Sequence, residues 1–247
     1  MDTEKVRRKV EAAYREAMSS DKRIASIAKK GKKSYTDAAA YASRAGRHMG
    51  EALANSIKEA LDVAITEEEA ISLIPPSLQL NYRNVSAIAK AAQEAMNEDV
   101  EIGLMALTPE FDERRAAEIA AETAENFIQH QLIVSCENAS RKVVDESMRV
   151  NAEAQSRAGL EVTVTRIYDG VGLRDGTQVC EWCLERCGTD MPFQEAFDKG
   201  AFERHEGCGC DIFYRTSKRL QHQTDWHHNK WEDVSEKQLK ARREHGV

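Results

Sequence analysis

The feature that most restricts the fold of this chain is a dense group of cysteines between Cys180 and Cys210. Five of the six cysteines in the 247-residue sequence lie there, and His205 lies among them. A C-x2-C pair, followed about two dozen residues later by a second Cys/His group, is the usual construction of a structural zinc site. Such a stretch must fold around one point, so the pattern predicts a small module closed by one structural zinc ion.

A tetrahedral zinc ion takes four ligands, and this stretch offers more than four. Cys180 and Cys183 supply the first pair, and we expect Cys208 with either Cys210 or His205 to complete the set. Cys208 and Cys210 are two residues apart, so on a strand they would face the same way. A filled cage leaves no open position for a substrate. We therefore predict no catalytic residue, no further cofactor and no small-molecule substrate.

Two cysteines remain outside this predicted ligand set. Cys187 is a spare within the cluster, and Cys136 lies alone on an apolar stretch, where a small core residue is the simplest interpretation. The alternatives to a zinc ion are buried thiols without metal, or disulfides formed in an oxidising compartment. Clustered cysteines in a reducing cytosol are more often metal ligands than disulfides.

The amino-acid composition limits the classes of protein to which this chain can belong. Charged residues make up 31% of the chain, only four residues are proline, and the formal net charge is −7. This composition favours long helices and disfavours a protein that coats DNA, which would normally be basic. No apolar run approaches the roughly 18–20 residues that span a bilayer, and the acidic N-terminus lacks the apolar core of a signal peptide.

Hydrophobic periodicity predicts helices throughout the first half of the chain. The long stripe from Ala38 to Ala64 is rich in small residues at one end, which permits close approach of another helix. Thr66 and Glu69 are spaced as a capping box, and Pro75-Pro76 is expected to end that helix. The predicted elements are helices at 3–18, 36–65, 66–74 and 85–104, with loops at 21–34 and 77–84.

The second half begins with one long predicted helix. Thr108-Pro109-Glu110 is a favourable helix start, and no glycine or proline follows until Gly159. This pattern predicts a helix of about 50 residues, roughly 75 Å long. A strand at 161–168, a short helix at 193–198, a strand at 210–215 and a helix at 235–244 are expected after it.

The predicted fold class is mostly α, a long-helix bundle with a small C-terminal α+β zinc-binding module. Four parts are expected: an N-terminal helical region (1–107), a long helix (108–160), the α+β Cys/His module (161–215), and a polar C-terminal tail with a short helix (216–247).

The order of these features resembles a known family. A long helix leads into a strand that ends in Tyr168-Asp169-Gly170, then come Arg174-Asp175-Gly176-Thr177 and Cys180-Glu181-Trp182-Cys183, and the module ends in His205-Glu206-Gly207-Cys208-Gly209-Cys210. Over roughly residues 108–215 this is similar to the MuF-type phage head morphogenesis, or phage minor capsid, proteins. Glu206 and Gly209 depart from the proline and arginine that are usual in that family.

The resemblance implies a non-enzymatic virion component near the portal vertex or in the capsid interior. It also implies assembly in the host cytoplasm, and a role in head assembly or in DNA packaging and ejection. Its partners would be the portal, major capsid or scaffolding protein, and the packaged DNA.

Two other functions remain open. A zinc-stabilised nucleic-acid- or protein-binding adaptor could use the basic run Lys29–Lys33 together with Lys240, Arg242 and Arg243. A His-Asn-His type nuclease would use His227, His228 and Asn229, although the elements that such a site needs cannot be placed here.

Overall fold

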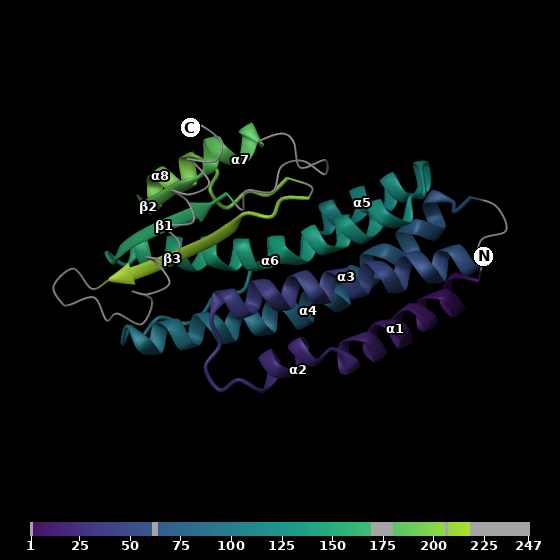
Figure 1. Ribbon diagram of the computed structural model, residues 1–247, viewed down its shortest axis with the longest axis horizontal. Coiled ribbons are helices and arrows are strands. Elements are labelled where there is room, and N and C mark those ends of the chain that lie inside the picture. The colour runs from purple at the N-terminus through teal and green to yellow at the C-terminus, as the bar shows by residue number, and fades with distance from the viewer. Residues whose placement is uncertain (1, 61–63, 169–179, 206, 218–247) are drawn as a thin grey trace. The chain divides into compact units, whose positions relative to one another are not determined.

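The computed structural model describes residues 2–60, 64–168, 180–205 and 207–217, and its elements are labelled in Figure 1. The chain divides into two compact units. The first comprises Met1–Ala95 and Ala106–Ser147, and the second comprises Met96–Met105 and the described residues from Met148 onward. The elements confirm a mostly α fold with a small α+β module. Among the described residues, none of the helices has the length and apolar character needed to cross a membrane.

The first unit is a bundle of helices. Its elements are α1 (Thr3–Ser20), α2 (Lys22–Lys29), α3 (Tyr35–Ala60), most of α4 (Glu67–Asp99), α5 (Glu113–Glu125) and the first part of α6 (Gln129–Arg157). Figure 1 shows α1, α3 and α4 running alongside one another. The predicted stripe on α3 lies in the core, where its members Ala38, Ala42, Ala45, Met49, Leu53 and Ile57 are fully buried. Cys136 of α6 is also fully buried, which confirms it as a core residue.

Polar side chains fix the register of these helices inside the core. The Tyr14 hydroxyl of α1 donates to Asn81 of α4 at 2.9 Å, and Asn81 in turn donates to Ser140 of α6. Ser140 closes this chain by donating to the carbonyl of Cys136 at 2.8 Å. Because each of these buried groups is satisfied only in one alignment of the helices, the network opposes sliding of one helix along another.

Residues 21–34 contain a helix where the sequence pattern predicts a loop, so that prediction is wrong. Asp21 caps α2 by accepting from the backbone N–H groups of Arg23 and Ile24, at 2.8 and 3.1 Å. Ile24 and Ile27 then bury one face of the short helix. A helix this short has too few apolar positions to show a clear period in the sequence.

Asp21 also joins α2 to α3, because its carboxylate accepts from Arg44 at 2.8 Å and contacts His48 at 2.9 Å. Burial raises the pKa of Asp21. The hydrogen bonds from His48, Arg44, Ile24 and Arg23 lower this pKa by a larger amount, so the net shift is downward.

We expect Asp21→Ala to lower the free energy of unfolding of the helical unit by about 2 kcal/mol. A carboxyl with a lowered folded pKa contributes stability above its unfolded pKa, near 3.9, and loses it as the pH falls through the folded value. The difference between wild type and variant in urea unfolding should therefore be full at pH 7 and shrink below about pH 4. Asp2→Ala, which removes the exposed cap of α1, is the control. A difference that is unchanged at pH 3 would contradict this account.

Pro75-Pro76 does not end a helix, which corrects the predicted break and the predicted loop at 77–84. α4 runs without interruption from Glu67 to Asp99, and the Thr66–Glu69 capping box at its start is confirmed by reciprocal bonds of 3.0 and 3.3 Å. The prolines cost hydrogen bonds to the carbonyls four residues earlier. Those carbonyls belong to the exposed Ile71 and Ser72, where water can satisfy them, and the buried apolar residues on either side hold the helix together.

The single helix predicted from residue 108 is also wrong, because two helices occupy this region. α5 begins at Glu113, where Asp112 caps it by accepting from the N–H of Arg115 at 2.9 Å. α5 ends at Glu125, and the extended backbone of Asn126 separates it from α6. No glycine or proline marks this break, and its cause is tertiary: Phe127 packs against the helical core.

The second unit is built on a three-stranded antiparallel sheet with the order β2-β1-β3. Its elements are β1 (Glu161–Ile167), α7 (Glu181–Arg186), β2 (Gly188–Pro192), α8 (Phe193–Asp198) and β3 (Asp211–Ser217). The strands predicted at 161–168 and 210–215 and the helix at 193–198 are confirmed to within two residues. The sequence pattern predicts neither β2 nor α7, and the helix predicted at 235–244 lies outside the described residues.

Candidate metal centre

Helix α7 carries three cysteines on one face. Cys180 is its N-cap and Cys187 is its C-cap, with Cys183 between them. Spacings of three and then four residues place side chains on the same side of a helical turn. All three cysteines are buried, so this short helix presents a row of sulfurs to the interior of the module.

The second group of donors lies in the turn that leads into β3. Gly207 has a φ of +73°, a left-handed conformation that favours glycine, and the N–H of Cys208 donates to the carbonyl of His205 at 3.2 Å. The guanidinium of Arg204 clamps this turn by donating to the carbonyls of Cys208 and Cys210, at 3.0 and 3.1 Å. β3 begins at Asp211, so Cys210, predicted as the first residue of the strand, lies just before it, and Cys208 lies in the preceding turn.

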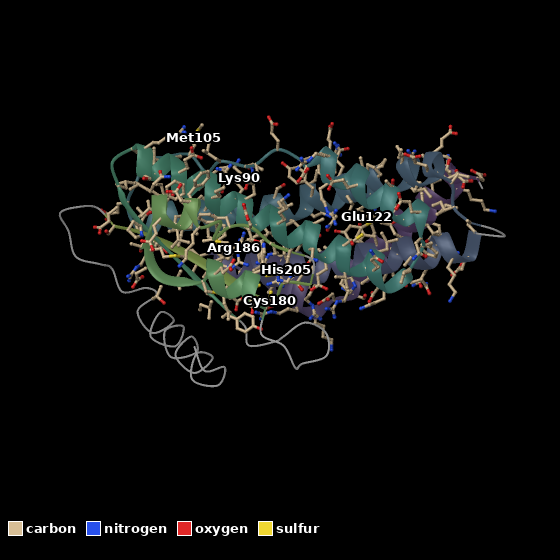
Figure 2. All side chains as sticks on the ribbon, turned by 90° about the horizontal axis from the view of Figure 1, so that it is seen from above. Lys90, Met105, Glu122, Cys180, Arg186 and His205 are labelled. Carbon is tan, nitrogen blue, oxygen red and sulfur yellow. The ribbon has the colours of Figure 1, made fainter. Side chains whose placement is uncertain are left out.

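The two groups meet in one cluster, which we call the Cys/His cluster. The Nε2 atom of His205 lies 3.3 Å from the Cys180 sulfur and 2.9 Å from the Cys183 sulfur, and Cys180 and His205 lie close together in Figure 2. The Cys183 sulfur lies 3.7 Å from that of Cys208. Every predicted ligand is therefore in the cluster, which can hold a metal ion in either of two sets, Cys180, Cys183 and His205 or Cys183, Cys208 and Cys210.

Aromatic side chains enclose the cluster. The backbone N–H of Cys180 donates to the Tyr168 hydroxyl at 3.2 Å. The Trp182 ring meets the His205 ring edge to face at 5.1 Å, and the Arg186 guanidinium stacks over Trp182 at 3.8 Å from the ring centre. These contacts orient the imidazole and keep water away from the sulfurs, as the surroundings of a metal site must do.

A buried arginine faces the sulfurs from β1. Arg166 is fully buried, and its Nη2 atom lies 3.4 Å from the Cys208 sulfur and 3.9 Å from the Cys183 sulfur. Its Nη1 atom donates to the carbonyls of Ala201 and Glu203. Burial lowers the pKa of Arg166, but the negative charge of the surrounding cysteines raises it more, so the guanidinium stays charged. A buried cation beside several sulfurs favours their thiolate form, which is the form that binds metal.

Four of the sulfurs also influence each other's protonation. Hydrogen bonds from Cys183, Cys187 and Cys208 lower the pKa of the Cys210 thiol. The hydrogen bonds with Cys208 and Cys210 raise the pKa of the Cys183 thiol, and the hydrogen bond with Cys210, together with burial, raises that of Cys187. The raised pKa values favour the protonated thiols of Cys183 and Cys187, and a bound ion must displace these protons. Metal binding should therefore release protons and weaken in acid.

We expect Arg166→Met to weaken metal binding about 10- to 100-fold, because it removes the cation that compensates the thiolates. Competition with a chromophoric chelator at pH 7 measures this change. Arg166→Lys should retain more of the affinity. Arg215→Met is the matched control, since Arg215 lies on β3 and bonds to Asp190 and Thr163. Unchanged affinity in folded Arg166→Met would show that Arg166 serves packing alone.

Sequence reasoning misses two members of the cluster. Cys187 is a spare in the predicted ligand set and belongs to neither of the two compact sets, yet it is buried in the same cluster, and its helical spacing from Cys180 and Cys183 is the signal that could have found it. Arg166 has no such signal, because an arginine in a β-branched strand is ordinarily an exposed residue.

The residues predicted for a nuclease or an adaptor near the C-terminus lie outside the described residues. They are His227, His228, Asn229, Lys240, Arg242 and Arg243.

The basic run Lys29–Lys33 is partly engaged within the protein. Lys30 forms an ion pair of 2.8 Å with Asp37, and the Lys33 ammonium donates to the Lys30 carbonyl at 2.7 Å. These contacts reduce the charge that the run can offer to a nucleic-acid backbone.

The fold and the site define a mostly helical protein with a small α+β module built around a Cys/His cluster that can bind a metal ion. Comparison of the chain with models of protein families, with curated proteins and with solved structures found no match.

Proposed function

We propose that the Cys/His cluster is a structural zinc centre. Thiolate and imidazole ligands in a compact site suit zinc, and two sulfurs on one tetrahedral ion lie about 3.8 Å apart for a zinc–sulfur bond of about 2.3 Å. The 3.7 Å between the Cys183 and Cys208 sulfurs fits this separation. The metal would contribute folding energy to the part of the module around the sulfurs, where the buried cluster consists mainly of the cysteines themselves with Tyr168.

We further propose that the protein is a phage minor capsid protein that acts in head morphogenesis without catalysing a reaction. The observation that carries this proposal is the meeting of the C-x2-C pair with His205 and Cys208 in a buried cluster, beside a strand that follows a long helix. This is the arrangement expected from the resemblance to the MuF-type family. A buried cage with all positions filled by protein has no room for a substrate.

In this role the protein would lie at the portal vertex or in the capsid interior. The portal, major capsid or scaffolding protein would be its partner, and the packaged DNA a further contact. The helical unit offers long exposed helix faces for such packing, and the metal centre would keep the smaller unit folded during assembly and passage of the DNA.

Quantitative mass spectrometry of purified procapsids and mature particles tests this function, with the portal subunit as the internal standard. We expect a reproducible ratio of this chain to the portal at or below one. Particles made with Cys183→Ala should contain less of the chain, and particles with Gly31→Ala, a change at a site without neighbours within 4 Å, should contain the wild-type amount. Absence of the chain from both procapsids and mature particles would disprove the proposal.

A further inference from the structure

A local excess of positive charge lies on α2 and just after it, although the whole chain has a net charge of −7. No acidic residue interrupts the basic side chains of residues 22–33, which are Lys22, Arg23, Lys29, Lys30, Lys32 and Lys33. Two of them are engaged inside the protein, since Lys30 pairs with Asp37 and the Lys33 ammonium donates to a backbone carbonyl. The charge that remains for a partner therefore lies mainly on the helix.

Helix α2 presents three cations on its exposed side, which we call the basic face of α2. These are Lys22, Arg23 and Lys29, and all three are exposed. Ile24 and Ile27 are buried, and because successive residues of a helix are about 100° apart, Lys22 and Lys29 point away from them. Figure 1 shows α2 at the edge of the helical bundle, where an extended partner can reach this face.

The neighbouring carboxylates do not neutralise the basic face. Asp21 accepts from Arg44 at 2.8 Å and contacts His48 at 2.9 Å, and both oxygens of Asp37 bind Lys30. Among the residues that the structure describes, no carboxylate forms an ion pair with any of the three cations. The basic face is therefore available to an external anion.

Two of the three cations stand where they disfavour the helix itself. Lys22 and Arg23 occupy the first turn of α2, which contains no acidic residue. The N-terminal end of a helix carries a partial positive charge, so cations there are repelled. Residues that oppose the local preference of their element are expected at functional positions.

The character of this surface indicates the kind of anion that it fits. No large exposed hydrophobic residue lies between residues 21 and 37, whereas a protein interface normally has an aromatic or apolar anchor at its centre. A helix that lies on a membrane must insert its apolar face, and the apolar face of α2 is buried in the bundle. Lysine, arginine and serine side chains such as Ser26, which lies between the cations, are typical donors to the phosphates of a nucleic acid.

We propose that the basic face of α2 binds the phosphate backbone of double-stranded DNA, without regard to its sequence. This inference rests on the DNA contact proposed above and names the surface that makes it. Single strands are bound by stacking of bases on aromatic side chains. The aromatic residue nearest in sequence, Tyr35, is half-buried and its hydroxyl donates to Gln93 at 2.6 Å, so the surface suits a duplex.

The salt dependence of binding counts the phosphate contacts. Three contacts predict a slope of about −2.7 in a plot of log binding constant against log salt concentration, a loss of about 40-fold between about 50 and 200 mM salt. Fluorescence anisotropy of a labelled duplex, titrated with the full chain at several salt concentrations, measures this slope. A chain that does not bind the duplex at about 20 mM salt would overturn the proposal.

A matched pair of triple variants separates this surface from net charge. The test variant neutralises the basic face through Lys22→Gln, Arg23→Gln and Lys29→Gln. The control lowers the net charge equally at exposed lysines of α1, α3 and α4, through Lys5→Gln, Lys58→Gln and Lys90→Gln. We expect the test variant to lose at least tenfold in affinity and most of the salt slope, and the control to keep both. Equal losses in the two variants would overturn the proposal, and unchanged circular dichroism shows that the test variant is folded.

Competitors identify the anion. An unlabelled duplex should displace the labelled one, whereas single-stranded DNA or phosphatidylserine vesicles at the same phosphate concentration should displace less. Equal or stronger displacement by the single strand or by the vesicles would overturn the assignment to duplex DNA. A chain found in particles that does not bind duplex would overturn this inference alone. Duplex binding by a chain that is absent from particles would support this surface and disprove the phage function proposed above.

Discussion

Chelation of the proposed zinc ion is expected to unfold the Cys/His module while the helical unit stays folded. Apparent binding free energies of structural zinc are on the order of 10 kcal/mol, comparable to the whole stability of a small domain. The buried apolar cluster around the sulfurs consists mainly of the cysteines themselves with Tyr168, so few other apolar contacts hold this part of the module together. Hydrogen exchange followed by mass spectrometry should show that β1, β2 and β3 lose protection in chelator, whereas α1 and α3 keep theirs.

Cys183→Ala should reproduce the effect of the chelator in metal-replete buffer. Cys183 belongs to both possible ligand sets, so no rearrangement of the remaining donors restores a complete site. Cys136→Ala is the matched control, because it removes a buried thiol from α6 without touching the cluster. Its cost, about 1–2 kcal/mol for a small cavity, should be confined to the helical unit. Strand protection that survives chelation would refute the structural role of the metal.

Adding a single methyl group at Gly50 will destabilise the helical unit by about 3 kcal/mol. A Cβ atom at this position would lie 2.6 Å from the Cα of Ile133 on α6. At Gly46, one turn earlier, a Cβ would lie 2.4 Å from the Ser140 Oγ and 2.7 Å from the Cys136 carbonyl. The two glycines therefore let α3 and α6 approach each other almost backbone to backbone.

Two effects oppose each other in Gly50→Ala, and their relative sizes decide whether the free energy of unfolding falls or rises. Alanine is favoured over glycine in a helix interior by about 1 kcal/mol. The clash is larger because the atom that must move belongs to a backbone and cannot rotate away. Urea unfolding of Gly50→Ala, compared with Gly31→Ala, measures the difference. A Cβ atom added at Gly31 would meet no other atom within 4 Å, so that variant should be near neutral, and a stabilised Gly50→Ala would exclude the close contact.

The candidate site is largely predictable because its chemistry depends on the types of residue present and on their spacing in the sequence. The C-x2-C pair and the His205–Cys210 group identify metal donors whatever the fold around them, and the structure brings all of them together. The spacing could not give the distances among Cys187, Cys208 and Cys210, because the chain between the two groups folds through α8 and β2. The buried position of Arg166 depends on which face of β1 turns towards the sulfurs.

The periodic stripe on α3 and the capping box of α4 were determined by the sequence alone, because they depend on residues a few positions apart. The course of the chain through Pro75-Pro76 and its break at Asn126 were decided by tertiary structure. Two prolines end a helix unless its flanking apolar residues find a core, and here Leu73 and Ile74 before the prolines and Leu78 after them are all buried. No glycine or proline stands at residue 126, and Phe127, just past the end of α5, packs against the helical core. Such choices depend on partners distant in the chain, which a local pattern does not contain.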